Sequence, residues 1–180
     1  MHRKNVLMLL AIPAFLVMYG SPDAKDLTLN SSQTQVYFSP NGGATSAIIR
    51  ELAQAKNEIL VQAYSFTSKE IAKALVDAHK RGVRTEIILD KSNRSKKYSG
   101  GDFTAHMGIP TYIDAVHVIA HNKIMIIDRF VVITGSFNFT RAAENNNAEN
   151  LIIIRSQELA KIYLDNWELH KRHSQAYMGR

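Results

Sequence analysis

The order of the apolar segments constrains the fold of this chain most strongly. Between residues 35 and 90, β-strand patterns alternate with segments in which apolar residues recur at helical spacing. Between residues 111 and 155 the apolar segments are short and closely spaced, as in neighbouring strands, and a long helical pattern covers 157–175. That last helix carries Leu159, Tyr163 and Leu169 near one face. We therefore expect an α/β fold with a mixed, largely central β-sheet flanked by helices on both faces.

The first 24 residues have the three-part layout of a secretory signal peptide. Arg3 and Lys4 give a positive start, an apolar stretch follows, and small or turn-forming residues end the segment. We expect cleavage after Gly20 or Ala24, with an uncleaved anchor as the alternative. The sequence thus predicts a signal peptide at 1–24, a single domain at 25–180, and an exported protein, periplasmic or secreted.

The charge of the chain favours polyanionic partners. Its formal net charge is +6 and its pI is near 9.5, and removal of residues 1–24 leaves the domain basic. Nucleic acid is the first candidate partner and an anionic membrane surface the second. Cysteine is absent, which excludes disulfides, thiol catalysis and thiolate metal sites.

The segment HNKIMIIDRFVVITGSFN at 121–138 gathers residues suited to phosphate chemistry. His121 and Lys123 are two apart on a predicted strand, so their side chains share a face. His121 can act as nucleophile or proton donor near neutral pH, and Lys123 supplies a positive charge for a phosphate oxygen. Ser136 and Asn138 are neutral donors that can bind the same oxygen.

One further feature of this segment is expected to support the site. Gly135 has no Cβ, so its backbone can approach a substrate closely. Such a set stabilises an anionic phosphoryl group without a metal, and we predict neither a metal nor a cofactor.

The segment resembles the phospholipase D superfamily signature H-x-K-x4-D-x6-G-S-x-N. Every fixed position of that signature is filled, by His121, Lys123, Asp128, Gly135, Ser136 and Asn138. With its small size and single motif, the chain is similar to the bacterial endonucleases of the Nuc type within that superfamily. The likeness covers about residues 34–176.

The resemblance implies a two-histidine mechanism. One histidine forms a covalent phosphohistidine and the other protonates the leaving oxygen. No second H-x-K occurs in the chain, so the second histidine would come from the other subunit of a homodimer, with the active site at the interface. The resemblance also implies that Glu149 orients His121, and that Asp128 belongs to the catalytic set in a structural or supporting role.

Other charged and histidine-bearing segments allow two readings each. The loop carrying Lys91, Arg94, Lys96 and Lys97 could contact a phosphate backbone, or be an ordinary solvated loop. His117 and His121 could suggest a metal site, but an i,i+4 pair needs a helix and this region reads as strand. The basic last turn of the final helix, which includes His170 and His173, is accounted for by the helix dipole.

We expect the substrate to be DNA, and RNA as a further substrate, cut with little sequence specificity. The first alternative is a phospholipid phosphodiesterase. The second is a non-catalytic nucleic-acid-binding module, against which the intact motif argues. After removal of the signal we expect no stable membrane association.

Overall fold

The computed structural model describes residues 25, 27–29, 32–95 and 99–180. The predicted signal peptide at 1–24, Lys96 and Lys97 lie outside the described residues. Within the described residues, one eight-stranded sheet has the order β1-β7-β6-β5-β2-β3-β4-β8. No helix in this part of the chain is both long and apolar enough to cross a membrane.

The sheet is mixed. Strands β2, β3 and β4 pair in parallel and all other neighbours are antiparallel. The strands are β1 (Thr34–Ser39), β2 (Glu58–Ala63), β3 (Arg84–Asp90), β4 (Thr111–Asp114), β5 (Lys123–Ile127), β6 (Val131–Gly135), β7 (Glu149–Arg155) and β8 (Gln175–Tyr177). The helices are α1 (Ala44–Gln54), α2 (Lys69–Lys80), α3 (Gly100–His106), α4 (Arg141–Asn145) and α5 (Gln157–His173), with a 3₁₀ helix η1 (Lys91–Arg94).

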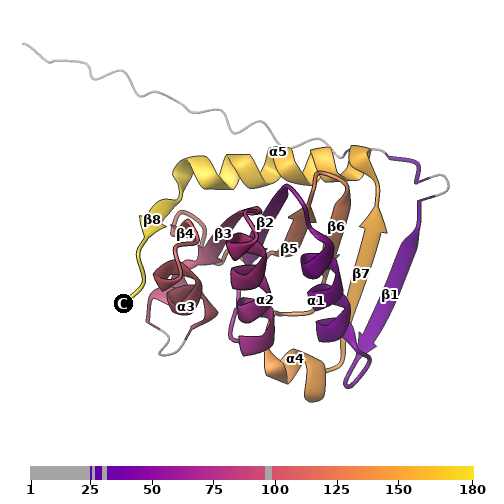
Figure 1. Ribbon diagram of the computed structural model, residues 1–180, viewed down its shortest axis with the longest axis horizontal. Coiled ribbons are helices and arrows are strands. Elements are labelled where there is room, and N and C mark those ends of the chain that lie inside the picture. The colour runs from indigo at the N-terminus through magenta and orange to yellow at the C-terminus, as the bar shows by residue number, and fades with distance from the viewer. Residues whose placement is uncertain (1–24, 26, 30–31, 96–98) are drawn as a thin grey trace, which may run out of the picture.

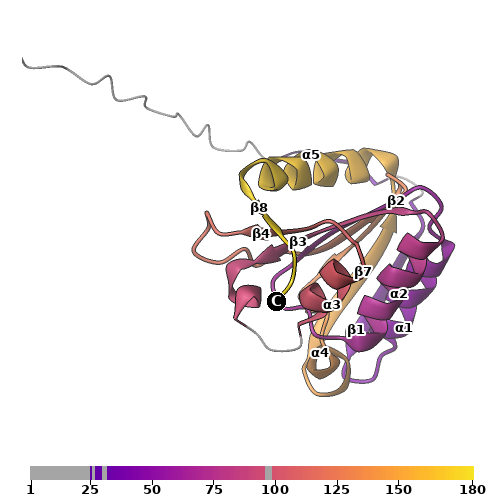
Figure 2. The same ribbon diagram turned by 60° about the vertical axis from the view of Figure 1, so that its left-hand side comes forward.

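Helices cover both faces of the sheet, as the sequence predicts. Helix α5 lies alone on one face and the other four α-helices lie on the opposite side (Figures 1 and 2). Strand β2 is buried on both faces because its side chains alternate between two cores. Ile59 and Val61 pack in the core that α1 and α2 contribute to, whereas Leu60 packs with Trp167 of α5.

Local sequence signals set the ends of α2. The Ser68 hydroxyl accepts a hydrogen bond from the Ile71 N–H at 3.3 Å, which caps the first turn. After the helix, Gly82 adopts a left-handed φ of 91°. A serine before the first turn and a glycine after the last are start and stop signals that a sequence can show.

Two features of the C-terminal region differ from the expectation. The buried residues of α5 are Ala160 and Trp167, while Leu169 is 53% exposed. Trp167 is fixed by its indole N–H, which donates to the Val61 carbonyl at 3.0 Å. Strand β8 was not predicted, because three residues with little apolar pattern give no strand signal in a sequence.

Candidate active site

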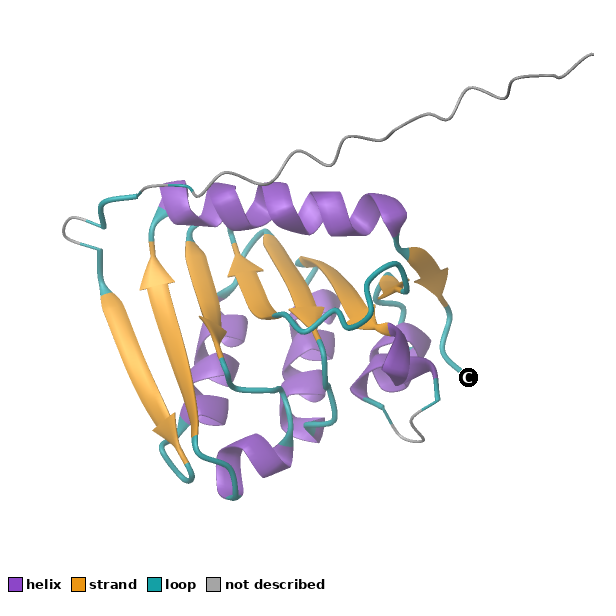
Figure 3. Cartoon of the chain, turned by 180° about the vertical axis from the view of Figure 1, so that it is seen from behind, coloured by secondary structure: helices purple, strands orange, loops and turns teal. Residues whose placement is uncertain are grey.

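The strand directions, which can be followed in Figure 3, bring most of the motif to one end of the strands. We call this end, where β2 and β6 finish and β5 and β7 begin, the sheet edge. β2 ends at Ala63, whose register partner is Lys123 at the start of the antiparallel strand β5. β6 runs antiparallel to both β5 and β7, so it ends at Gly135, next to the start of β7 at Glu149. Lys123, Glu149 and the residues that follow Gly135 therefore meet at this edge.

His121 lies just before β5 and not within it, so the expectation that His121 and Lys123 share a face of one strand was wrong. They are joined instead through the backbone, because the Lys123 Nζ donates to the His121 carbonyl at 2.6 Å. The His121 side chain is exposed, and its ring lies 4.5 Å from that of Tyr64, centroid to centroid. The Lys123 Nζ is 5.3 Å from the same tyrosine ring.

Tyr64 is the residue of this site that the sequence analysis missed. It follows β2 directly, and its backbone N–H donates to the Asn122 carbonyl at 2.9 Å. Its ring therefore lies near both the His121 ring and the Lys123 ammonium. The only available signal was its position, one residue beyond a fully buried strand.

Lys123 is buried, with 6% of its surface exposed. Burial lowers the pKa of Lys123 below its ordinary value, and the negative charge of Glu149 partly opposes that change. A buried ammonium of this kind is poised to attract an anionic group, since little water competes for its charge.

Ser136 and Glu149 form a hydrogen-bonded network beside Lys123. The Ser136 hydroxyl donates to Glu149 Oε2 at 2.6 Å and accepts from the Asn150 N–H at 3.0 Å. The Asn147 side-chain amide donates to Glu149 Oε1 at 3.0 Å. Among the described residues Glu149 makes no hydrogen bond to His121. The contact expected from the resemblance is therefore absent within this chain.

Asn138 is half-buried, and its Oδ1 atom is buried without a hydrogen-bond partner among the described residues. Its backbone carbonyl accepts from the Thr140 N–H at 2.7 Å, which fixes the main chain. A buried polar atom left without a partner is costly, and in native proteins it often marks a position that a ligand completes. As an acceptor, Oδ1 can meet only a donor such as a substrate hydroxyl, whereas the Asn138 amide nitrogen can donate to a phosphate oxygen.

Gly135 has a structural role different from the one expected. Its φ is 146°, and a Cβ added there would lie 2.2 Å from the Asn150 carbonyl oxygen on β7. Glycine is therefore required because β6 and β7 approach closely at this point. That approach brings Ser136 within reach of Glu149.

The chain is similar to known proteins over most of its length. Residues 48–169 match the family described as "Cardiolipin synthase, PLD-like domain". The chain belongs to the phospholipase D superfamily.

Two relatives within the superfamily share most of the chain. A Rickettsia conorii protein named Phospholipase D is 46% identical over 139 residues, covering 77% of this chain and 70% of that protein. The crystal structure of Nuc from Salmonella typhimurium has a TM-score of 0.78 and 38% identity, covering 81% of this chain and 98% of that one. NucT from Helicobacter pylori has a TM-score of 0.73 at 22% identity, covering 81% and 99%, and supports the fold.

In this superfamily member, the motif aspartate is separated from the other motif residues. Asp128 follows β5 at the end opposite to Lys123. Its carboxylate accepts the N–H groups of Lys56, Asn57 and Glu58 at 2.9, 2.7 and 2.9 Å. Burial alone would raise the pKa of Asp128, but these hydrogen bonds hold it below its ordinary value.

This geometry fits the structural or supporting role expected of Asp128 and gives it no described contact with His121 or Lys123. Asp128 adopts a left-handed φ of 51° in the turn between β5 and β6 and ties that turn to the start of β2. Its role is to hold the hairpin that carries the motif.

Lys91 and Arg94 lie on η1, after the end of β3, and both are exposed. The Lys91 Nζ donates to the His117 carbonyl at 3.0 Å. The Arg94 guanidinium donates to Gln175 Oε1 at 2.5 Å. Each side chain therefore already donates a hydrogen bond within the chain, and neither has a described contact with the motif.

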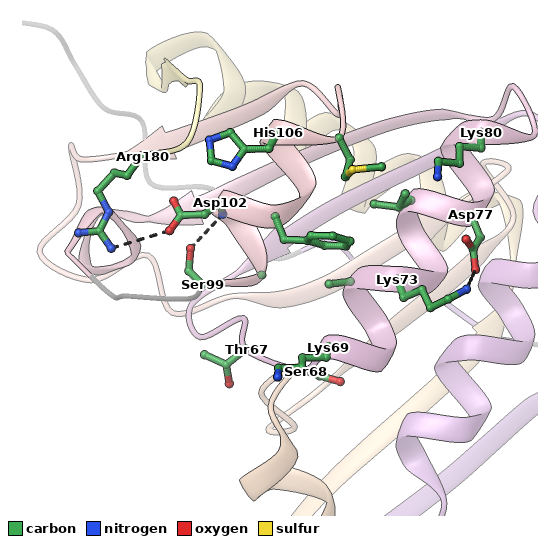
Figure 4. A pocket seen from close by; sticks show the side chains of 15 residues that line it. Thr67, Ser68, Lys69, Lys73, Asp77, Lys80, Ser99, Asp102, His106 and Arg180 are labelled. Carbon is green, nitrogen blue, oxygen red and sulfur yellow. Dashed lines mark hydrogen bonds and ion pairs between the residues drawn. The ribbon is translucent and has the colours of Figure 1, made fainter.

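A hollow between α2 and α3 lies apart from the motif (Figure 4). Lys69, Lys73 and Lys80 line it from α2, and Phe103 and Met107 add apolar surface from the α3 side. None of His121, Lys123, Ser136, Asn138 and Glu149 lines this hollow. The motif residues are therefore at the sheet edge and not in this hollow.

Proposed function

We propose that the chain is a metal-independent phosphodiesterase that hydrolyses DNA, and RNA as a further substrate, with little sequence specificity. Superfamily membership supports phosphodiester hydrolysis. The observation that carries the proposal is the edge cluster, where exposed His121 lies beside buried Lys123. Asn138 and Ser136 follow the adjacent strand.

The proposed reaction passes through a phosphohistidine. A ring nitrogen of His121 attacks phosphorus, and the bond to the leaving oxygen breaks as that oxygen takes a proton from the partner subunit's His121. Water then attacks phosphorus and the P–N bond breaks, with the partner's His121 accepting the proton of water. Lys123 and the Asn138 amide nitrogen bind the phosphate oxygens throughout, and the Lys123 ammonium still has two N–H groups to offer. The Ser136 hydroxyl joins them only if its proton turns from Glu149 to the phosphate.

A homodimer is proposed because this chain has one motif and the reaction uses two histidines. The segment between β4 and His121 supports the location of the interface. It exposes three apolar side chains beside the catalytic histidine, Val116 at 61%, Val118 at 85% and Ile119 at 54%. A two-fold axis near this segment would cover that apolar surface and bring the two His121 side chains together.

DNA is the favoured substrate for two reasons. The net charge is +6, and the 38% identical Nuc structure matches the chain over 98% of its own length. A phospholipid substrate is the second candidate, because the matching family is described as cardiolipin synthase and the Rickettsia relative is named Phospholipase D. Lys91 and Arg94 remain candidate phosphate contacts, if DNA displaces their present partners.

The test is a substrate panel in EDTA with the purified chain. Supercoiled plasmid, single-stranded DNA and cardiolipin vesicles are offered to the wild type, His121→Ala and the control His106→Ala, which changes an exposed histidine on α3. We expect DNA cleavage by the wild type and His106→Ala and none by His121→Ala. Hydrolysis of cardiolipin without cleavage of DNA would show that the substrate is a phospholipid. DNA cleavage by His121→Ala would refute the proposed mechanism.

A further inference from the structure

Three histidines and one aspartate converge outside the motif. Asp114 is fully buried at the end of β4, and His117 follows in the segment that leads to β5. His170 and His173 lie in the last turn of α5, which ends beside β4 and β8 (Figure 1). One potential ligand atom from each of the four residues lies within 4.8 Å of the other three.

The contacts centre on a single carboxylate oxygen. Asp114 Oδ2 is 2.7 Å from His170 Nδ1, 3.0 Å from His117 Nδ1 and 3.2 Å from His173 Nε2. Asp114 Oδ1 accepts the Val116 backbone N–H at 3.1 Å, which fixes the plane of the carboxylate. The ring centroids of the three histidines are 4.8 to 5.3 Å apart.

Hydrogen bonds already hold the four side chains together. The His117 Nδ1 atom is also 3.2 Å from Asp114 Oδ1, so the three histidines and the Val116 N–H share the two oxygens of one carboxylate. A cation at the centre would replace these hydrogen bonds by taking one lone pair from each imidazole and one from the carboxylate.

The helix dipole was expected to account for His170 and His173. Their contacts show a more specific arrangement. The neighbouring Lys171 is directed elsewhere, since its ammonium pairs with Glu86 Oε2 at 2.5 Å. His170 and His173 are three residues apart, so they occupy the same side of the helix. Both contact Asp114, which the chain brings in from another element 56 and 59 residues away.

We propose that Asp114, His117, His170 and His173 bind one divalent transition-metal ion of the zinc class. Three imidazole nitrogens and one carboxylate oxygen form a ligand set that zinc favours, whereas calcium and magnesium prefer oxygen ligands alone. In a tetrahedral site with bonds of about 2.0–2.1 Å, ligand atoms lie roughly 3.3 Å apart, which small side-chain movements would reach here. Four protein ligands leave no open position, as in structural zinc sites.

Such an ion would act on the fold and not on the reaction. It would fasten the end of α5 to β4 and to the segment 115–122, which leads into His121. The proposal departs from the sequence-based expectation of no metal, and it does not depend on the proposed function. It can be tested without any substrate.

The first test is zinc titration of the purified chain after treatment with EDTA and removal of the chelator. We expect one zinc per chain by calorimetry. With free zinc at 100 times Kd, we expect a rise in Tm on the order of 5–10 °C. Loading with Co²⁺ should give the visible absorption of a tetrahedral site.

Variants separate this site from adventitious binding to histidines. His117→Ala and His173→Ala each remove one ligand whose side chain is partly exposed, at 45% and 29%, so that folding should survive. Zinc affinity should fall at least about 10-fold in both and stay unchanged in His106→Ala. The proposal is overturned if the wild type takes up no stoichiometric zinc, or if these two variants bind zinc as the wild type does.

Discussion

The Ser136 hydroxyl donates a 2.6 Å hydrogen bond to Glu149 Oε2, joining the end of β6 to the start of β7. The same hydroxyl accepts the Asn150 N–H at 3.0 Å. Ser136 is therefore held in one orientation at the edge where Lys123 begins β5. Because Glu149 also acts on Lys123 through its charge, this bond connects two parts of the proposed phosphate site.

Ser136→Ala should weaken catalysis more than stability. It removes the hydrogen bond that orients Glu149 beside Lys123, and a loss of ~1.5–3 kcal/mol in transition-state stabilisation would lower kcat/KM roughly 10- to 100-fold. DNA cleavage kinetics measure the change, and thermal unfolding checks the fold. Ser68→Ala, which removes the cap of α2, should do the reverse and lower Tm with kcat/KM retained. Equal kcat/KM in Ser136→Ala and the wild type would argue against a role for this bond.

Lys123 should limit activity at alkaline pH. The reaction needs its positive charge, and burial lowers its pKa below the ordinary 10.5. The rate should thus fall as pH rises through a value below 10.5. Arginine keeps its proton over this range, so the residual activity of Lys123→Arg should lack that fall. The measurement is kcat/KM against pH, with Lys161→Met as a surface control; an identical alkaline fall in Lys123→Arg would assign it to another group.

Asp128→Asn should reduce stability and leave the chemistry intact. Because its pKa is lowered in the folded state from the ordinary 3.8, the ionised carboxylate stabilises the fold above about pH 3.8, and this contribution is lost as pH falls through the lowered value. At pH 7 the variant should lose ~1–2 kcal/mol of unfolding free energy, because an amide replaces a charged acceptor of three N–H groups.

Denaturant unfolding at pH 7 and at low pH checks this expectation. Asp165→Asn is a suitable control, because Asp165 pairs with Lys161 on the surface and is 66% exposed. The difference between wild type and Asp128→Asn should shrink in acid. A large loss of kcat in folded Asp128→Asn would instead show that Asp128 takes a direct part in the chemistry.

Local patterns in the sequence were sufficient for most of the fold. Ser68 and Gly82 mark the ends of α2, and the apolar residues Ile59, Leu60 and Val61 indicate the strand β2. Those signals depend on residues within a few positions of each other. The mixed sheet flanked by helices follows from their order along the chain.

The parts that were not predicted depend on contacts between distant segments. Nothing near Asp114 in the sequence indicates that His170 and His173 reach it from α5. The requirement for Gly135 comes from the backbone of β7, not from its neighbours in the chain. Asp128 sits within the motif spacing, yet the length of β5 carries it to the opposite edge of the sheet.

The most direct test of the account is plasmid cleavage in EDTA by mixtures of wild-type and His121→Ala subunits, exchanged at a fixed total concentration. If each site uses both histidines of a dimer, a half-and-half mixture should retain about a quarter of the wild-type rate, and pure His121→Ala should have none. Retention of about half would show that each subunit works alone. A rate that does not change with the fraction of His121→Ala would contradict the account altogether.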